Sequence, residues 1–295
     1  MLYTEDFATY LKQTKKSSAN TVASYMRDIK KFDSYIENLS ADFLKVNSKT
    51  VNSYISDMQT KGQAVSSVLR SIASLKAFYR YLVSLGKVSN NPFEEINPPK
   101  LPERNISVLT SKETDLLLSQ PVAVGFKGCR DKAMLELLYA TGIKVTELIA
   151  LKTTDLNMQE NYISCGEGLN SRNIPLGSIA LNALKEYLPM RNSNILIDDE
   201  NDYLFVNISG GKMSRQGFWK IIKFYADKAK IKKDITPGTL RHSFAVHLIE
   251  SGAEVSAVQE MLGHTAEFST KIYSDVVNGR LGSVYKKTRA SRKKK

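Results

Sequence analysis

Four prolines crowded into one short stretch constrain the fold of this chain more than any other feature. Pro92, Pro98, Pro99 and Pro102 fall within eleven positions. Each ring fixes its own backbone angle, removes an amide donor and pushes the preceding residue out of helical geometry. The stretch therefore predicts an extended linker. It divides the 295 residues into two parts, and each part is long enough to bury its own core.

The residues before the linker are predicted to be helical throughout. Apolar side chains recur at helical spacing in three runs, over 7–36, 48–58 and 65–85. A polar turn at 17–20 splits the first run into two helices. These patterns predict an all-helical domain over 1–97, with the linker over 98–109.

Helical spacing also dominates the residues after the linker, with one exception. Residues 162–165 and 173–176 are short runs that flank a glycine-bearing turn, Gly166-Glu-Gly-Leu-Asn-Ser-Arg172. They predict two strands. We therefore expect a mainly α protein, in which a helical domain precedes a mixed, mostly helical domain over 110–285 with a small β-sheet. A basic tail over 286–295 completes the chain.

The charge balance favours a polyanionic partner. The sequence has 42 Lys and Arg against 30 Asp and Glu, a formal net charge of +12, which is typical of proteins that bind nucleic acid. The last ten residues hold seven of the basic side chains and no acidic one. Another eight lie in the stretch 212–233, interleaved with aromatic and aliphatic residues, and predict a basic helix with an apolar face. The alternative for that stretch is an ordinary solvated face whose lysine stems cover apolar surface.

Composition and spacing disfavour several other classes of protein. No apolar run approaches the ~18 residues that span a bilayer, and the N-terminus lacks the regions of a signal peptide. Cys129 and Cys165 lie in no metal-ligand spacing. His242 and His247 lie five apart, so they do not share a helix face at ligand spacing, and we interpret both as structural. We expect a cytoplasmic, nucleoid-associated protein with no metal site and no membrane partner.

Several motifs stand out together in the second half of the chain. They are Ala140-Thr-Gly-Ile-Lys-Val-Thr-Glu-Leu148, Thr236-Pro-Gly-Thr-Leu-Arg-His-Ser-Phe-Ala245, Leu262-Gly-His-Thr265 and Ser269-Thr-Lys-Ile-Tyr-Ser-Asp275. With the stretches 18–29 and 67–82 and Asn91-Pro92, they make the chain resemble the tyrosine recombinase (phage integrase) family, and most closely its bacterial Xer branch. Each motif alone would be a weak signal, but their order and spacing together are specific.

The resemblance implies a chemistry. In this family a tyrosine breaks one DNA strand and forms a 3′-phosphotyrosine link, with no metal or nucleotide cofactor. Tyr273 matches the nucleophile, Arg241 matches the second catalytic arginine, and His264 matches the position that hydrogen-bonds the scissile phosphate. Taken singly, these could be a packing residue, a salt-bridge partner and a helix-end cap. Their joint spacing favours the catalytic interpretation.

Three positions depart from the family pattern. Lys144 replaces the first catalytic arginine and keeps the charge without the bidentate geometry. Glu167 replaces the catalytic lysine, and a carboxylate repels phosphate and has no proton to give at neutral pH unless its pKa is raised. Gly238 replaces a histidine and has no side chain. Arg172, five residues after Glu167, is a candidate substitute cation.

Two functions therefore remain open, and whether the chain is an enzyme depends on these three positions. One is a site-specific recombinase or integrase that acts on duplex DNA by self-association or with a related recombinase. The other is a catalytically impaired, recombinase-like DNA-binding protein with an architectural, regulatory or accessory role. The candidate DNA-binding side chains come from the predicted helices of both domains: Arg27, Arg70, Lys76, Arg80, Arg215, Lys220 and Lys223.

Overall fold

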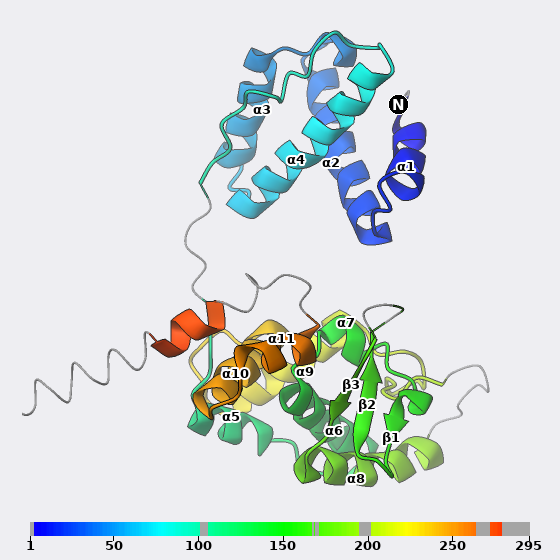
Figure 1. Cartoon of the computed structure of the whole chain (residues 1–295), viewed down its shortest axis with the longest axis vertical. Coiled ribbons are helices and arrows are strands. Elements are labelled where there is room, and N and C mark those ends of the chain that lie inside the picture. Colours follow the sequence, from blue (N-terminus) through cyan, green and yellow to red (C-terminus); the bar gives the residue numbers. More distant parts are fainter. Residues whose placement is uncertain are drawn as a thin grey trace, which may run out of the picture. The chain divides into compact units, whose positions relative to one another are not determined.

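The computed structural model describes residues 3–100, 106–166, 168, 171–194, 202–263 and 272–278. The chain divides into two compact units, residues 1–104 and 105–295, each with its own core (Figure 1). The division falls inside the segment predicted to be the linker. Within the described residues, no helix is long and apolar enough to cross a bilayer.

The first unit is helical, as predicted. Its helices are α1 (Thr4–Gln13), α2 (Ala19–Asn38), α3 (Ser48–Thr60) and α4 (Val65–Ser84), with a short 3₁₀ turn at Phe43–Lys45. Ser18 and Asn47 cap α2 and α3, because their side-chain oxygens accept backbone N–H groups of the first turn. Aromatic rings fill the core, and they include Phe93 from the proline-bearing segment after α4. Phe93 lies before the predicted linker, within the range 1–97 given to this domain, and it is part of this unit's core.

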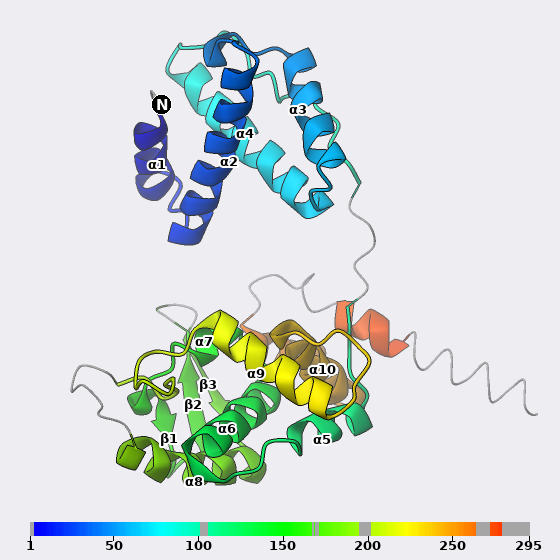
Figure 2. The ribbon, with the colours of Figure 1, turned by 180° about the vertical axis from the view of Figure 1, so that it is seen from behind.

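The second unit is built around one largely buried helix. Its helices are α5 (Ser111–Leu118), α6 (Gly125–Thr141), α7 (Val145–Leu148), α8 (Ser178–Asn194), α9 (Arg215–Lys228), α10 (Pro237–Glu250) and α11 (Val255–Leu262), and residues 272–278 are also helical. A 3₁₀ turn lies at Thr153–Asp155. Buried residues lie on every side of α6, which is typical of a helix enclosed by others. It packs against α5, α8 and α10 (Figure 2).

A small antiparallel sheet lies beside these helices, as the sequence predicts. Its strands are β1 (Leu156–Asn157), β2 (Tyr162–Cys165) and β3 (Arg172–Pro175), paired in that order (Figure 1). Ile163 and Ile174 face each other across β2 and β3 and are both buried. Because side chains alternate along a strand, this register leaves Arg172 opposite Cys165 at the end of the hairpin. The two-residue β1 was not predicted, since two residues show no periodicity.

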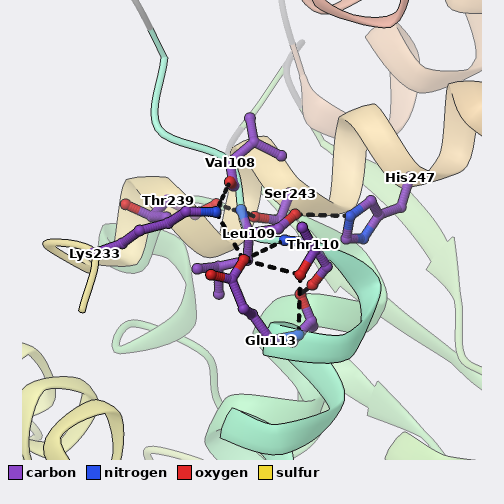
Figure 3. Close-up of polar contacts among 9 residues, drawn as sticks. Val108, Leu109, Thr110, Glu113, Lys233, Thr239, Ser243 and His247 are labelled. Atoms are coloured by element: carbon purple, nitrogen blue, oxygen red, sulfur yellow. Dashed lines mark hydrogen bonds and ion pairs between the residues drawn. The ribbon is translucent and has the colours of Figure 1, made fainter. Parts of the chain in front are cut away.

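The start of the second unit is tied to α10 by a network of polar contacts (Figure 3). The Leu109 amide donates to Ser243 Oγ at 2.9 Å, and His247 Nε2 donates to the Leu109 carbonyl at 3.0 Å. Lys233 donates to the Val108 carbonyl at 3.2 Å. The Tyr139 hydroxyl lies 3.0 Å from the other ring nitrogen of His247. These contacts support the structural interpretation of His247 and hold α10 in place.

Candidate active site

Arg241 lies on α10 and is only 8% exposed. Its Nη1 donates to the Gly142 carbonyl at 2.6 Å, and its Nη2 donates to the Leu262 carbonyl at 2.8 Å. The second acceptor is at the C-terminal end of α11, where the helix dipole attracts a cation. Burial lowers the pKa of Arg241, and the neighbouring positive charge of Arg172 acts in the same direction. The guanidinium is thus held in a fixed position that joins three segments of the unit.

Tyr273 brings its hydroxyl to this guanidinium. The residue belongs to the helical stretch 272–278 and is 2% exposed, packed in an apolar cluster with Phe244 and Leu262. Its hydroxyl interacts with the Arg241 guanidinium and opposes the lowering of the pKa of Arg241 by burial, and His242 Nδ1 lies 3.0 Å from the same oxygen. The predicted nucleophile and the predicted second arginine are therefore in contact.

A second guanidinium, that of Arg172, lies next to Arg241. Its Nε donates to the Met261 carbonyl at 2.7 Å, one residue before the carbonyl that Arg241 binds. Its two Nη atoms donate to the carboxylate of Glu147 at 3.1 and 3.2 Å. The candidate substitute cation is therefore already in the site, held by a bidentate ion pair.

Glu147 is ionised in this arrangement. Burial by itself raises the pKa of this carboxyl group, but the hydrogen bonds from Arg172 and from the Lys144 backbone, together with both positive charges, lower it overall. The Lys144 amide donates to the carboxylate at 2.7 Å. One acidic side chain thus orders two of the basic positions in the site.

Lys144 itself is exposed at the start of α7. With Arg172, Cys165 and Gly263 it lines a pocket of about 650 Å³ between α7, the β2–β3 turn and the end of α11. Lys152 and the acidic Glu147 and Asp155 complete the charged part of the lining. Lys144 therefore presents a positive charge to solvent beside Arg172, although it lacks a guanidinium fork.

Gly238 and His242 form a feature that the sequence interpretation missed. A Cβ added to Gly238 would lie 3.4 Å from Thr236 Oγ1 and 3.7 Å from His242 Nε2. The interpretation of His242 as structural overlooked its contact with the Tyr273 hydroxyl. The spacing from 238 to 242 puts both positions on one helix face, and this spacing could have indicated that His242 lies beside Gly238.

Glu167 and His264, two further predicted positions, lie outside the described residues, as does the tail over 286–295. Among the described residues, no group of three or more His, Cys, Asp or Glu side chains could hold a metal ion.

The predicted DNA-binding residues of the first unit differ in their surroundings. Arg70 donates to both carboxylate oxygens of the buried Asp28, at 2.8 and 2.9 Å. Lys76 and Arg80 both pair with Glu94, at 3.2 and 2.7 Å. Arg27 is exposed on α2. The charges of the first three side chains are therefore partly compensated within the unit.

The predicted residues of the second unit lie on α9. Arg215 and Lys220 are exposed. Lys223 pairs with Asp234, and its ammonium group lies 5.5 Å from the centre of the Trp219 ring. Within the described parts of the chain, no ion pair engages Arg215, Lys220 or Arg27.

Comparisons with known sequences cover both units. The phage integrase N-terminal SAM-like domain matches residues 4–86, and the phage integrase family matches residues 107–280. The chain is 41% identical to the tyrosine recombinase XerD of Listeria innocua over 96% of each chain. It is 35% identical to XerD of Staphylococcus epidermidis, over 95% of this chain and 96% of that one.

Solved structures share the fold. XerH site-specific recombinase bound to a palindromic difH substrate, in a post-cleavage complex, aligns with a TM-score of 0.78 at 19% identity, covering 97% of this chain and 84% of that one. A lambda integrase dimer bound to a core site aligns with a TM-score of 0.73 at 17% identity, covering 94% and 77%. With the matches to both family domains and to XerD, these findings lead to one conclusion: this chain belongs to the phage integrase family, as a Xer-like tyrosine recombinase.

Proposed function

We propose that this chain is a site-specific recombinase that breaks and rejoins duplex DNA through a covalent link between Tyr273 and a 3′ phosphate. The observation that carries the proposal is the contact of the Tyr273 hydroxyl with Arg241 and His242. Attack of a phenol on phosphorus needs cationic donors beside it, because negative charge grows on the phosphorus oxygens in the transition state. The site offers the hydroxyl and a guanidinium together.

The other charges of the site support phosphodiester chemistry. Arg172 and Arg241 bind adjacent carbonyls of α11, and Lys144 adds a third positive charge nearby. Guanidinium groups suit phosphate because their planar fork can hold two oxygens at once. Lys144 stabilises the charge on the phosphate less well than an arginine at that position would. We infer that Arg172 supplies part of the missing stabilisation.

The partner in this proposal is duplex DNA, bound near the nucleoid by two or more recombinase subunits. The net charge of +12 and the exposed Arg27, Arg215 and Lys220 support DNA binding. Relatives whose structures were solved as complexes with DNA, one of them as a dimer, support both the partner and the self-association.

A covalent-trapping experiment tests the proposal. A preferred site is selected from a random duplex pool by binding, and a nicked version of it traps the cleaved product. We expect a protein–DNA adduct that survives denaturant, is lost in Tyr273→Phe and is kept in the control Tyr162→Phe. No adduct from the unaltered chain, on DNA that it binds tightly, would refute strand cleavage.

The non-cutting alternative is favoured by the missing imidazole at Gly238 and the missing fork at Lys144. Loss of one preorganised donor typically costs about 10²–10³ in rate. If only the triple variant Lys144→Arg, Glu167→Lys, Gly238→His forms the adduct, the chain is a DNA-binding protein that has lost its chemistry.

A further inference from the structure

We propose that His242 takes the place of the imidazole that Gly238 lacks, and that it accepts the proton of the Tyr273 hydroxyl during strand cleavage. The inference rests on the proposed function, in which Tyr273 attacks DNA. It assigns a chemical role to a residue outside the positions taken from the family resemblance.

The space in front of Gly238 is where the His242 ring lies. The two residues are four apart on α10, so they occupy the same face one turn apart. A Cβ on Gly238 would lie 3.7 Å from His242 Nε2. A side chain at 238 would therefore lie in van der Waals contact with the His242 ring, so an imidazole at either position is on the same part of the helix surface.

The opposite side of the His242 ring faces the proposed nucleophile. Nδ1 lies 3.0 Å from the Tyr273 hydroxyl, and the two ring centres are 5.6 Å apart with planes inclined by 46°. His242 thus spans the gap between the Gly238 backbone and the hydroxyl, with one nitrogen toward each.

His247, on the same helix, has a structural role and can be compared with His242. One of its nitrogens contacts the Leu109 carbonyl (Figure 3) and the other the Tyr139 hydroxyl, and both contacts tie parts of the scaffold together. The contact of His242 is instead with a hydroxyl beside Arg241, inside the site.

Between Arg241 and His242, the side chain that can take a proton is that of His242. Arginine stays protonated in proteins, so Arg241 can stabilise a phenolate but cannot accept the phenol proton. A neutral imidazole can accept it near neutral pH. In this pair, Arg241 stabilises the negative charge on the phenolate and His242 removes the phenol proton.

A bond forms between the Tyr273 phenol oxygen and phosphorus while the phenol proton moves to His242 Nδ1. The bond from phosphorus to the 5′ oxygen breaks, its electron pair stays on that oxygen, and water supplies the proton that completes the 5′ hydroxyl. In rejoining, the 5′ hydroxyl attacks phosphorus and gives its proton to the hydroxide that cleavage left, the bond from phosphorus to the phenol oxygen breaks, and the imidazolium returns its proton to the departing phenolate.

Single-turnover adduct formation on the nicked substrate tests the proposal. We expect His242→Ala to slow it by about 10²–10³, within the usual contribution of a positioned base. His242→Gln keeps a hydrogen-bonding group without basicity and should not restore the rate. The double variant Gly238→His, His242→Ala should recover at least tenfold, whereas the matched control Gly238→Ala, His242→Ala should recover nothing.

A second substrate identifies the oxygen on which His242 acts. Replacing the bridging 5′ oxygen by sulfur gives a leaving group that needs no proton. The defect of His242→Ala should persist on this substrate, because the attacking hydroxyl is unchanged. Disappearance of the defect would assign His242 to the leaving group and overturn the proposal.

Other results would overturn it as well. An unchanged rate in His242→Ala, or a full rate in His242→Gln, would exclude proton acceptance. A slow His242→Ala that has also lost DNA affinity and is not rescued by Gly238→His would show a structural role. If the unaltered chain forms no adduct, strand cleavage itself fails, and that result is seen before any variant is compared.

Discussion

At the scale of single residues, Gly142 is important for the hydrogen bonding and packing around Arg241. Gly142 ends α6 with φ +60 and accepts the Nη1 hydrogen bond of Arg241 at 2.6 Å. A Cβ at this position would lie 2.3 Å from Phe244 Cδ1 and 2.8 Å from Leu262 Cδ2. The position therefore excludes a side chain for two reasons, the left-handed backbone and the close packing.

Gly142→Ala should reduce the free energy of unfolding by more than about 2 kcal/mol, since it combines overpacking with an unfavourable backbone conformation. Gly252→Ala is the control, because Gly252 has φ +96 but no atom within 4 Å of an added Cβ. We expect this control to lose about 1 kcal/mol from the backbone alone. Urea unfolding of the full chain measures both variants, and equal losses would show that the packing around Gly142 is not tight.

At the scale of elements, a buried polar network joins α6 to α9. Arg130 Nη2 donates to Asp131 Oδ1 at 2.7 Å, and the Tyr225 hydroxyl donates to Asp131 Oδ2 at 3.1 Å. Arg130 Nη1 also donates to the Val206 carbonyl at 3.3 Å. Burial raises the pKa of Asp131, and the charge of Arg130 and these hydrogen bonds oppose that shift. The network makes the helix contact depend on charge pairing as well as on apolar packing.

Asp131→Asn should destabilise the second unit by about 3 kcal/mol, because it leaves the buried Arg130 without its counter-charge. Tyr225→Phe should cost about 1 kcal/mol, the usual value of one hydrogen bond. The exposed pair Lys152–Asp202 offers the control, since Asp202→Asn should leave the unfolding midpoint nearly unchanged. Chemical denaturation of the full chain separates these outcomes, and a small effect of Asp131→Asn would contradict the importance of the pair.

At the scale of the whole molecule, the positive charge is unevenly spread along the chain. The last ten residues hold seven basic side chains and no acidic one, whereas several basic residues of the helices are paired with carboxylates. Each contact between a basic side chain and a DNA phosphate releases counterions. Each such contact therefore increases the dependence of DNA affinity on salt concentration.

DNA affinity should therefore fall steeply with salt, and replacing the seven basic residues of 286–295 by Gln should flatten the dependence. The slope of log K against log salt should drop by up to about 6, since each phosphate contact contributes about 0.9. Gel-shift titration at several salt concentrations measures it. Keeping the residues as Gln rather than deleting them separates charge from chain length. An unchanged slope would mean that the tail does not touch DNA.

The helices were predictable from the sequence because their signal is local. Periodicity predicted every helix of the first unit and the mostly helical character of the second. The strand β1 was missed because two residues cannot show a period. The motif order likewise predicted the family, and it singled out Tyr273 and Arg241, which the structure brings together.

The sequence by itself thus determined the family, the helical elements and the identity of the central tyrosine and arginine. Only the tertiary structure decided which charges are already paired, as with Arg70 and Asp28, and which histidine meets the tyrosine. His242 and Tyr273 are 31 residues apart, and Arg172 and Glu147 are 25 apart. Periodicity and motif spacing reflect interactions between residues that are close in the sequence. The pairs His242–Tyr273 and Arg172–Glu147 form only when the packing of apolar faces brings distant segments within hydrogen-bonding distance.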